Sequence, residues 1–116
     1  MIKTKSVFEP KETSDGQRIL VSRYWPRNIE PRAVDLWFPE LGNRLELIKN
    51  WPSGRFNWDY FKNDYLDKLN EPKLQPLLKN LADTASQTTI TLLGQARQSK
   101  HCHRTLLKDY LDKLLV

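Results

Sequence analysis

The sequence predicts a small α/β domain with a mostly parallel sheet of few strands, flanked by helices. A continuous apolar run, Ile19-Leu20-Val21, is typical of a strand buried on both faces. A second β-branched strand pattern, Thr88 to Leu93, lies near the C-terminus, and amphipathic helical patterns lie between the two. Strands at both ends with helices between them need crossover connections, so we expect the sheet to be at least partly parallel.

The length of 116 residues predicts one domain, residues 1–116, with enough chain for a hydrophobic core of its own. No internal repeat or long linker divides it. A single cysteine cannot form an internal disulfide, so we expect a reducing, cytoplasmic environment. No apolar run approaches the roughly 20 residues that span a bilayer, and no early apolar segment resembles a signal peptide, so we expect no membrane association.

In the first half, Met1 to Phe8 alternates weakly and predicts a short edge strand. The following polar stretch ends in Asp15-Gly16, a dipeptide typical of turns. Arg18 to Tyr24 is the best candidate for a central strand, and Trp25-Pro26 ends it. Ala33 to Gly42 fits both a strand and a helix, and its Pro39 would interrupt either one.

In the second half, apolar residues recur mostly at helical spacing, with one strand pattern among them. The predicted elements are a short helix at Asn43–Trp51, a helix at Asn57–Leu69, a helix at Glu71–Ala85, the strand at Thr88–Leu93 and a last helix from about Cys102 to Leu115. Asn57 is the expected N-cap of its helix. Pro72 is expected in the first turn of the next one, where proline is tolerated.

The net charge of +5 is unevenly distributed along the chain. Residues 1–32 and 95–116 each carry a net charge of +3, whereas residues 33–94 carry −1. If the two ends of the chain meet in the fold, they form a positive face that attracts anions. The alternative is that the charges are distributed over a solvated surface without forming such a face. No run of Lys or Arg occurs, which argues against a nucleic-acid partner without excluding one.

The segment His101-Cys102-His103-Arg104 lies between a predicted strand and a predicted helix. In open α/β sheets, ligands bind at such carboxyl strand ends. Cys102 is the candidate nucleophile, because a helix start and neighbouring cationic groups stabilise a thiolate. The alternative is that Cys102 is a small buried residue that anchors the helix, as free cysteines often are.

Other residues of this segment are candidates for binding rather than for metal ligation. Three adjacent residues converge poorly on one ion, and no second cysteine or histidine cluster exists, so we expect no metal. His103 is expected to hydrogen-bond a backbone carbonyl or to contact a ligand. Arg97 and Arg104 are the anion-binding candidates, since free helix-start amides already favour phosphate or carboxylate.

A second cluster, Arg23-Tyr24-Trp25-Pro26-Arg27, follows the predicted central strand. Arg23 and Arg27 bracket the aromatic ring of Trp25, which suits a flat anionic ligand such as a nucleotide. The alternative is that Trp25 fills the core while the arginines are solvated or paired with Asp35 or Asp59. No glycine-rich dinucleotide or P-loop motif, nucleophile elbow or zinc-protease motif is present, so no cofactor is expected.

The chain resembles the YeaO-like proteins, known as domain of unknown function 488. The resemblance rests on the opening segment from Ile2 through Arg18–Arg27, on the aromatic helix with Phe61, Tyr65 and Leu69, and on Thr91-Leu92-Leu93 with the later Cys102-His103-Arg104. It implies a small cytosolic α/β domain with a Rossmann-like, three-layer core and no established activity. Two departures stand out: Asn28 replaces the usual glycine after Trp-Pro-Arg, and Gly94 stands where some relatives carry a cysteine.

These patterns favour a protein that binds a small anionic, phosphate- or nucleotide-like ligand between the Arg23–Arg27 and Arg97–Arg104 loops. The alternative is a protein–protein interaction module without catalytic activity. Weak contact with nucleic acid is a third hypothesis. The sequence decides neither whether a reaction is catalysed nor which oligomeric state is adopted.

Overall fold

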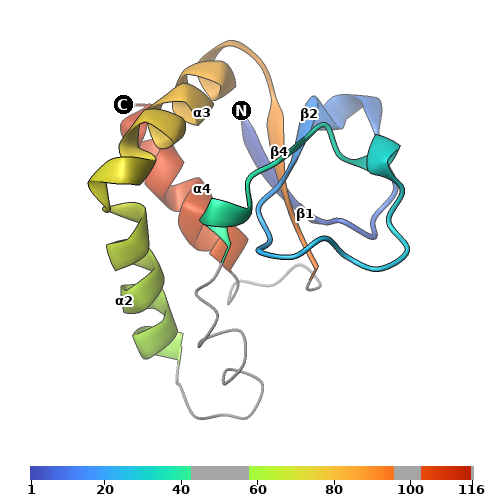
Figure 1. Ribbon diagram of the computed structural model, residues 1–116. Coiled ribbons are helices and arrows are strands. Elements are labelled where there is room, and N and C mark those ends of the chain that lie inside the picture. Colours follow the sequence, from blue (N-terminus) through green and yellow to red (C-terminus); the bar gives the residue numbers. More distant parts are fainter. Residues whose placement is uncertain (43–57, 96–102, 116) are drawn as a thin grey trace.

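The fold is built around a four-stranded sheet in which every strand pairing is parallel (Figure 1). The computed structural model describes residues 1–42, 58–95 and 103–115. The strands are β1 (Ile2–Ser6), β2 (Gln17–Leu20), β3 (Leu36–Trp37) and β4 (Ile90–Gly94), in the spatial order β1-β4-β2-β3. The predicted α/β class with a parallel sheet is therefore confirmed, and β1 is an edge strand as expected.

Three α-helices lie together on one side of this sheet (Figure 1). They are α2 (Trp58–Leu69), α3 (Gln75–Gln87) and α4 (His103–Leu114). All three lie close to the ranges that the apolar spacing predicts. Pro72 begins a short 3-10 turn, η5 (Pro72–Leu74), that leads directly into α3. The helix expected at Asn43–Trp51 and the N-cap expected at Asn57 lie outside the described residues.

The two faces of the sheet are covered differently. Alternate residues such as Ile19 and Leu92 point toward the helices and join the main hydrophobic core. On the other face, Leu20 and Leu93 form a smaller core with Val7, against which the loop residues Trp25, Ile29 and Val34 pack. The third layer of the core is thus made of loops and two 3-10 turns, η1 (Thr13–Asp15) and η2 (Pro31–Ala33).

The ambiguous segment Ala33–Gly42 combines a very short strand with turns. Pro39 begins the 3-10 turn η3 (Pro39–Leu41), directly after the two-residue strand β3. A proline at the first position of such a turn loses no backbone hydrogen bond, which explains why Pro39 ends the strand without breaking the fold. The predicted strand Arg18–Tyr24 also ends early, because β2 stops at Leu20 and the chain then turns away from the sheet.

A charged cluster, which we call the loop-side cluster, lies beneath the loops: Lys3, Lys5, Asp15 and Arg18. The Asp15 carboxylate is fully buried and accepts hydrogen bonds from Arg18 Nη1 at 2.6 Å and from Lys5 Nζ at 3.1 Å. Lys3 Nζ lies 3.2 Å from the same carboxylate. Three cations of the basic N-terminal segment are therefore directed at one internal carboxylate.

Hydrogen bonding decides the protonation of this cluster. Burial alone would raise the pKa of Asp15, but the Glu12 amide and the three cations hydrogen-bond its charged form and hold the pKa far below its ordinary value. Burial alone would lower the pKa of Lys5, but hydrogen bonds to Glu12 and Asp15 raise it above its ordinary value. Asp15 and Lys5 are therefore both charged at neutral pH.

Gly16 closes the turn that carries Asp15. Its φ of +62° is a conformation that side chains disfavour, and a Cβ atom here would lie 2.0 Å from the Thr89 carbonyl oxygen. Only glycine allows the turn to approach β4 this closely. Within the described residues, no helix is both long and apolar enough to cross a membrane.

Candidate ligand site at the carboxyl edge of the sheet

An open hollow lies where β2 and β3 end. Its lining residues are Arg23 and Tyr24, which follow β2, and Pro39 and Glu40, which follow β3. Its volume is about 310 Å³. Because neighbouring parallel strands end at the same edge of a sheet, two segments distant in sequence form its two walls.

The two charged residues of the hollow are available to a ligand. Arg23, Tyr24 and Glu40 are exposed, with the Tyr24 side chain 51% accessible. Within residues 1–42, 58–95 and 103–115, neither Arg23 nor Glu40 forms an ion pair. A guanidinium, a carboxylate and an aromatic ring therefore face solvent side by side.

Buried donors from α2 fix the wall that carries Glu40. The Tyr65 hydroxyl donates to the Leu41 carbonyl at 2.6 Å, and Lys68 Nζ donates to the Gly42 carbonyl, also at 2.6 Å. Both side chains are at least nine-tenths buried. Gly42 then touches the other wall: a Cβ atom added there would lie 2.4 Å from the Arg23 backbone nitrogen. The walls are thus held in direct backbone contact, which requires glycine at position 42.

Donors from the other side fix the wall that carries Arg23. His103, the first residue of α4, lies with Nε2 2.9 Å from the Val21 carbonyl oxygen. The Gln95 side chain donates to the Tyr24 carbonyl at 3.3 Å, and the Trp37 indole donates to the Ser22 carbonyl at 2.7 Å. Both described ends of the connection from β4 to α4 therefore contact the segment that follows β2. The shared site of the Arg23–Arg27 and Arg97–Arg104 loops stays a prediction, because residues 96–102 lie outside the described residues.

His103 is neutral at physiological pH. Burial lowers its pKa, the hydrogen bond to Val21 opposes this, and the charges of Arg104 and Lys68 lower it further, to about 4. Because a carbonyl oxygen only accepts, Nε2 must carry the proton in this contact, so Nδ1 is left as an acceptor. The ring also meets Tyr65 edge to face, with centroids 5.6 Å apart.

Arg104 lies in the interior. Its side chain is fully buried, and Nη1 donates to the Lys5 carbonyl at the end of β1. The stem of Arg104 passes Gly94 so closely that a Cβ at position 94 would lie 2.9 Å from it. The structure thus places Arg104 between the ends of β1 and β4, where it supplies positive potential near His103 rather than a surface contact.

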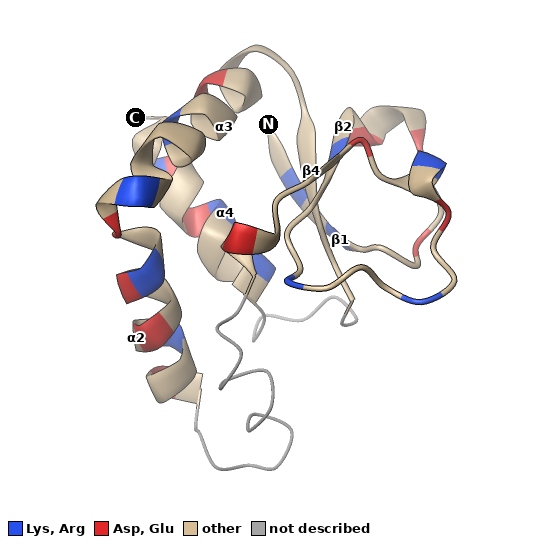
Figure 2. Cartoon of the chain, in the orientation of Figure 1, with Lys and Arg blue, Asp and Glu red and all other residues tan. Residues whose placement is uncertain are grey.

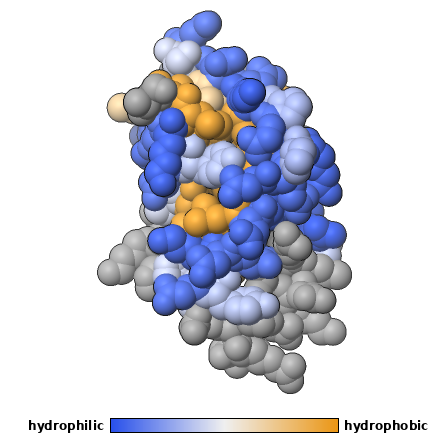
Figure 3. Space-filling model, turned by 90° about the vertical axis from the view of Figure 1, so that its left-hand side faces the viewer, coloured by the Kyte–Doolittle hydropathy of each residue, from blue (hydrophilic) through white to orange (hydrophobic). Residues whose placement is uncertain are grey.

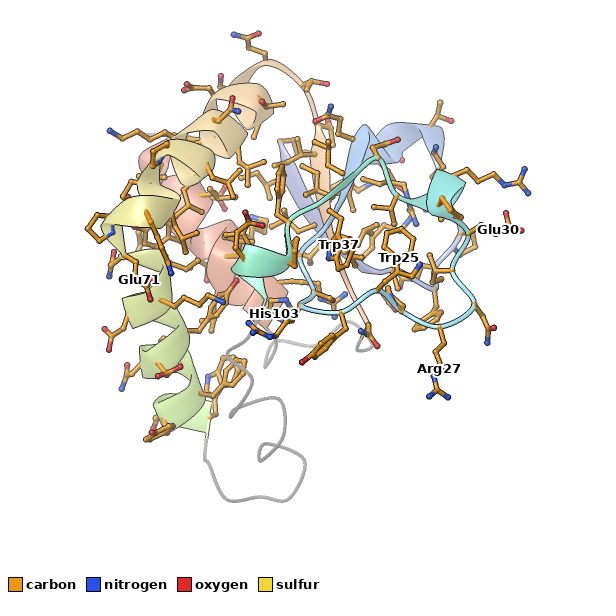
Figure 4. The ribbon with its side chains drawn as sticks, in the orientation of Figure 1. Trp25, Arg27, Glu30, Trp37, Glu71 and His103 are labelled. Atoms are coloured by element: carbon orange, nitrogen blue, oxygen red, sulfur yellow. The ribbon has the colours of Figure 1, made fainter. Side chains whose placement is uncertain are left out.

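Trp25 and Arg27 differ in their surroundings (Figure 4). The Trp25 indole donates to the Ile29 carbonyl at 3.1 Å and packs edge-on against Trp37, with centroids 5.5 Å apart. The side chain of Arg27 is exposed and points into solvent away from the two tryptophans. Trp25 therefore supports the loop, as the alternative interpretation expects, and Arg27 is not among the residues that line the hollow.

Two residues of the predicted site lie outside the described residues. Arg97 and Cys102 fall in the segment 96–102, so their placement is not described. Asp35, the alternative partner for the arginines, instead accepts a hydrogen bond from the Arg18 backbone at 2.8 Å. Acidic and basic residues are interspersed along α2 (Figure 2).

Sequence reasoning missed Glu40, Tyr65 and Lys68. Tyr65 was expected only to fill the core. Lys68 carried a signal, because it stands three residues after Tyr65 and seven after Phe61, within the apolar stripe of α2. A lysine at such a position is buried only with a partner, and here that partner is a backbone carbonyl.

The comparisons with known proteins place the chain in a family and name no ligand. Residues 2–114 match the family model described as "DUF488-N3a: Active DUF488-N3 subclade". The chain belongs to the DUF488 family. It is 36% identical over 115 residues to the uncharacterized protein YeaO of Escherichia coli (strain K12), covering 97% of this chain and 98% of that protein.

More distant relatives of the family also lack an assigned function. The chain is 25% identical over 113 residues to the uncharacterized proteins Rv3073c of Mycobacterium tuberculosis (strain ATCC 25618 / H37Rv) and Mb3100c of Mycobacterium bovis, covering 96% of this chain and 93% of each of theirs. No solved structure matches the chain. The resemblance to the YeaO-like family is thereby confirmed over nearly the whole sequence.

The structure explains one departure from the family pattern. Asn28 has a φ of +63°, the left-handed conformation that glycine adopts most easily and that asparagine tolerates better than most residues. The turn after Trp-Pro-Arg is therefore kept in spite of the substitution.

Proposed function

We propose that this protein binds a small anionic, phosphate-bearing ligand at the carboxyl edge of its sheet, in the hollow lined by Arg23, Tyr24, Pro39 and Glu40. The observation that carries the proposal is the exposed Arg23 guanidinium on a wall whose backbone carbonyls are held by hydrogen bonds from His103 and Gln95. A guanidinium binds phosphate or carboxylate through two parallel hydrogen bonds. A fixed wall lowers the ordering cost of binding.

Electrostatics beside the hollow support the same ligand class. The charges of Arg104 and Lys68 lower the pKa of His103, which means that the potential at the start of α4 is positive. A potential that disfavours a proton favours an anion. The N-terminal end of α4 adds the partial positive charge of the helix dipole.

The test is a titration of inorganic phosphate and nucleotides by thermal shift and then by calorimetry. We expect Arg23→Ala to weaken binding at least about tenfold, since a hydrogen bond to a charged group contributes ~1.5–3 kcal/mol. Arg32→Ala is the matched control, because Arg32 is exposed and pairs with Glu30 away from the hollow. Equal binding by wild type and Arg23→Ala, or no binding by wild type, would contradict the proposal.

Arg27→Ala separates the hollow from the wider Arg23–Arg27 site that the sequence predicts. If Arg27→Ala binds phosphate and nucleotides as tightly as wild type does, the site is restricted to the hollow. A loss comparable to that of Arg23→Ala extends the site around the loop, with the ligand reaching past Trp25.

Catalysis at this edge is a second step of the proposal. The matched family model is described as an active subclade, which favours an enzyme. Cys102 is the proposed nucleophile on the sequence argument alone, one residue before His103. Iodoacetamide labelling against pH tests it: we expect Cys102 to react faster at neutral pH than free cysteine does, and an ordinary rate would assign it a packing role.

The alternative, a protein–protein interaction module, draws on exposed apolar side chains. Figure 3 shows apolar patches between hydrophilic residues on the side of the molecule that bears the helices. Leu114 and Leu115, at the C-terminal end of the chain, are 39% and 38% exposed. Light scattering over a range of concentrations, with Leu114→Ser for comparison, decides whether this surface mediates self-association.

A further inference from the structure

The hollow is lined by one guanidinium, that of Arg23, and by one carboxylate, that of Glu40, and the presence of both charges restricts which anions fit. We propose that Glu40 makes the site selective for nucleoside monophosphates over nucleoside di- and triphosphates. The inference rests on the proposed function, since it names the class of anion that the hollow binds.

The argument starts from the charges of the two walls. An ionised carboxylate only accepts hydrogen bonds, so Glu40 needs donors from a ligand, and neighbouring ribose hydroxyls supply two of them. Arg23, on the other wall, supplies the donors that a phosphate needs. One anionic group therefore finds a partner, whereas further phosphates would approach Glu40 and be repelled.

The remaining lining residues fit the rest of a nucleotide. The exposed ring of Tyr24 offers a face for base stacking, which tolerates any base. Pro39 adds an apolar surface to the opposite wall. The volume of about 310 Å³ lies at the lower end of the roughly 300–1,000 Å³ of small-molecule sites, so it suits a mononucleotide.

Selectivity also needs a fixed separation between the charges. The close approach of Gly42 to the Arg23 backbone couples the walls, and Tyr65 and Lys68 hold the residues that follow Glu40. Glu40 itself lies in the first turn of η3, directly before Leu41, whose carbonyl Tyr65 binds. The backbone that carries Glu40 is therefore fixed when a ligand with a second negative group binds.

The experiment measures the affinities of AMP, ATP and 2′,3′-dideoxy-AMP without divalent cations for wild type, Glu40→Gln and Arg23→Ala. We expect wild type to prefer AMP over ATP at least tenfold and to lose about tenfold in affinity with the dideoxy ligand. Glu40→Gln should reduce the preference for AMP to within about threefold, chiefly by gaining affinity for ATP. Glu30→Gln is the control, because Glu30 is an exposed glutamate that pairs with Arg32 outside the hollow.

The outcomes separate this inference from the proposed function. If Arg23→Ala abolishes binding while Glu40→Gln keeps the wild-type ratio, the inference is wrong and the anion site stands. Tighter binding of ATP than of AMP by wild type overturns it as well. If wild type binds neither nucleotide nor inorganic phosphate, both proposals fail. Thermal unfolding of each variant confirms that it is folded, which the exposure of both side chains leads us to expect.

Discussion

Two polar clusters of this small domain have different structural roles. In the loop-side cluster, cations meet a carboxylate, and Asp15 collects Lys3, Lys5 and Arg18 in a closed network. At the carboxyl edge, Tyr65, Lys68 and His103 instead contact backbone carbonyls of the segments around the hollow. The first cluster fastens a loop to the sheet, and the second sets the shape of a surface site.

The difference between the two clusters indicates which part of the molecule binds a ligand. A buried carboxylate that is fully hydrogen-bonded has no capacity left for a ligand. Donors directed at loop carbonyls leave the side chains of those loops turned outward, as Arg23, Tyr24 and Glu40 are. We therefore expect substitutions in the loop-side cluster to change stability and substitutions at the carboxyl edge to change binding as well.

The largest expected effect comes from Asp15→Asn. The substitution keeps the volume but leaves Arg18 buried without a counter-charge and Lys5 with only the exposed Glu12, which costs about 3–5 kcal/mol of unfolding free energy. Urea unfolding at pH 7 measures it. A loss below about 1 kcal/mol would mean that the cluster is not a closed unit, and the comparison between the two clusters would lose its basis.

The second effect is a pH dependence that His103 controls. The pKa of His103 is about 4 in the folded protein and ordinarily about 6.5. Between these two pH values, the imidazole is protonated in the unfolded chain and neutral in the folded protein. The contribution of this group to the unfolding free energy should be fully present above about pH 6.5, decline by ~3 kcal/mol as the pH falls to about 4, and level off below that. In His103→Gln, which keeps an N–H donor for Val21, this decline should disappear.

Asp15 contributes in a lower pH range, which allows the two clusters to be distinguished. Its folded pKa is depressed, so its contribution is present above its ordinary value near 3.8 and is lost as the pH falls below that. Identical slopes for wild type and His103→Gln between pH 6.5 and 4 would contradict the assignment to His103.

A smaller effect is expected from Tyr65→Phe. Removing the hydroxyl leaves the buried Leu41 carbonyl without this donor, at a cost of ~1–2 kcal/mol in unfolding free energy. Since Leu41 follows Glu40, the variant should also weaken binding of AMP about threefold under conditions in which it is fully folded. A change in stability with unaltered affinity would show that Tyr65 acts only in the core.

The smallest effect is expected from Glu30→Gln. The Glu30–Arg32 pair is as short as the Asp15–Arg18 pair, 2.6 Å in both, but its side chains are 67% and 84% exposed. Solvent screens such a pair, so its loss should change the unfolding free energy by less than about 0.5 kcal/mol. A double-mutant cycle with Arg32→Ala checks the coupling directly, and a coupling above 1 kcal/mol would contradict the role given to burial.

Sequence reasoning recovered the parts of this fold that depend on local periodicity. Phe61, Tyr65 and Leu69 mark the buried face of α2, and the apolar run Ile19–Val21 marks a central strand, since spacing along the chain determines which face is buried. At the candidate site, the hydrogen bond of His103 to a backbone carbonyl was expected from its place at a helix start. The joining of the Arg23–Arg27 and Arg97–Arg104 loops stays a prediction, because residues 96–102 lie outside the described residues. Local patterns did not predict the pairing of Asp15 with Lys5 or that of Lys68 with Gly42. Such pairings depend on which segments the fold brings together.

The strand order has a consequence for how the chain is made. β4, near the C-terminus, lies between β1 and β2, and its first residue, Ile90, stands level with both Ile2 and Gln17. During synthesis, the first two strands therefore leave the ribosome without the neighbour that each of them requires. The sheet closes only after some ninety residues have been translated, so we expect a slow, late folding step and full dependence on the final third of the polypeptide.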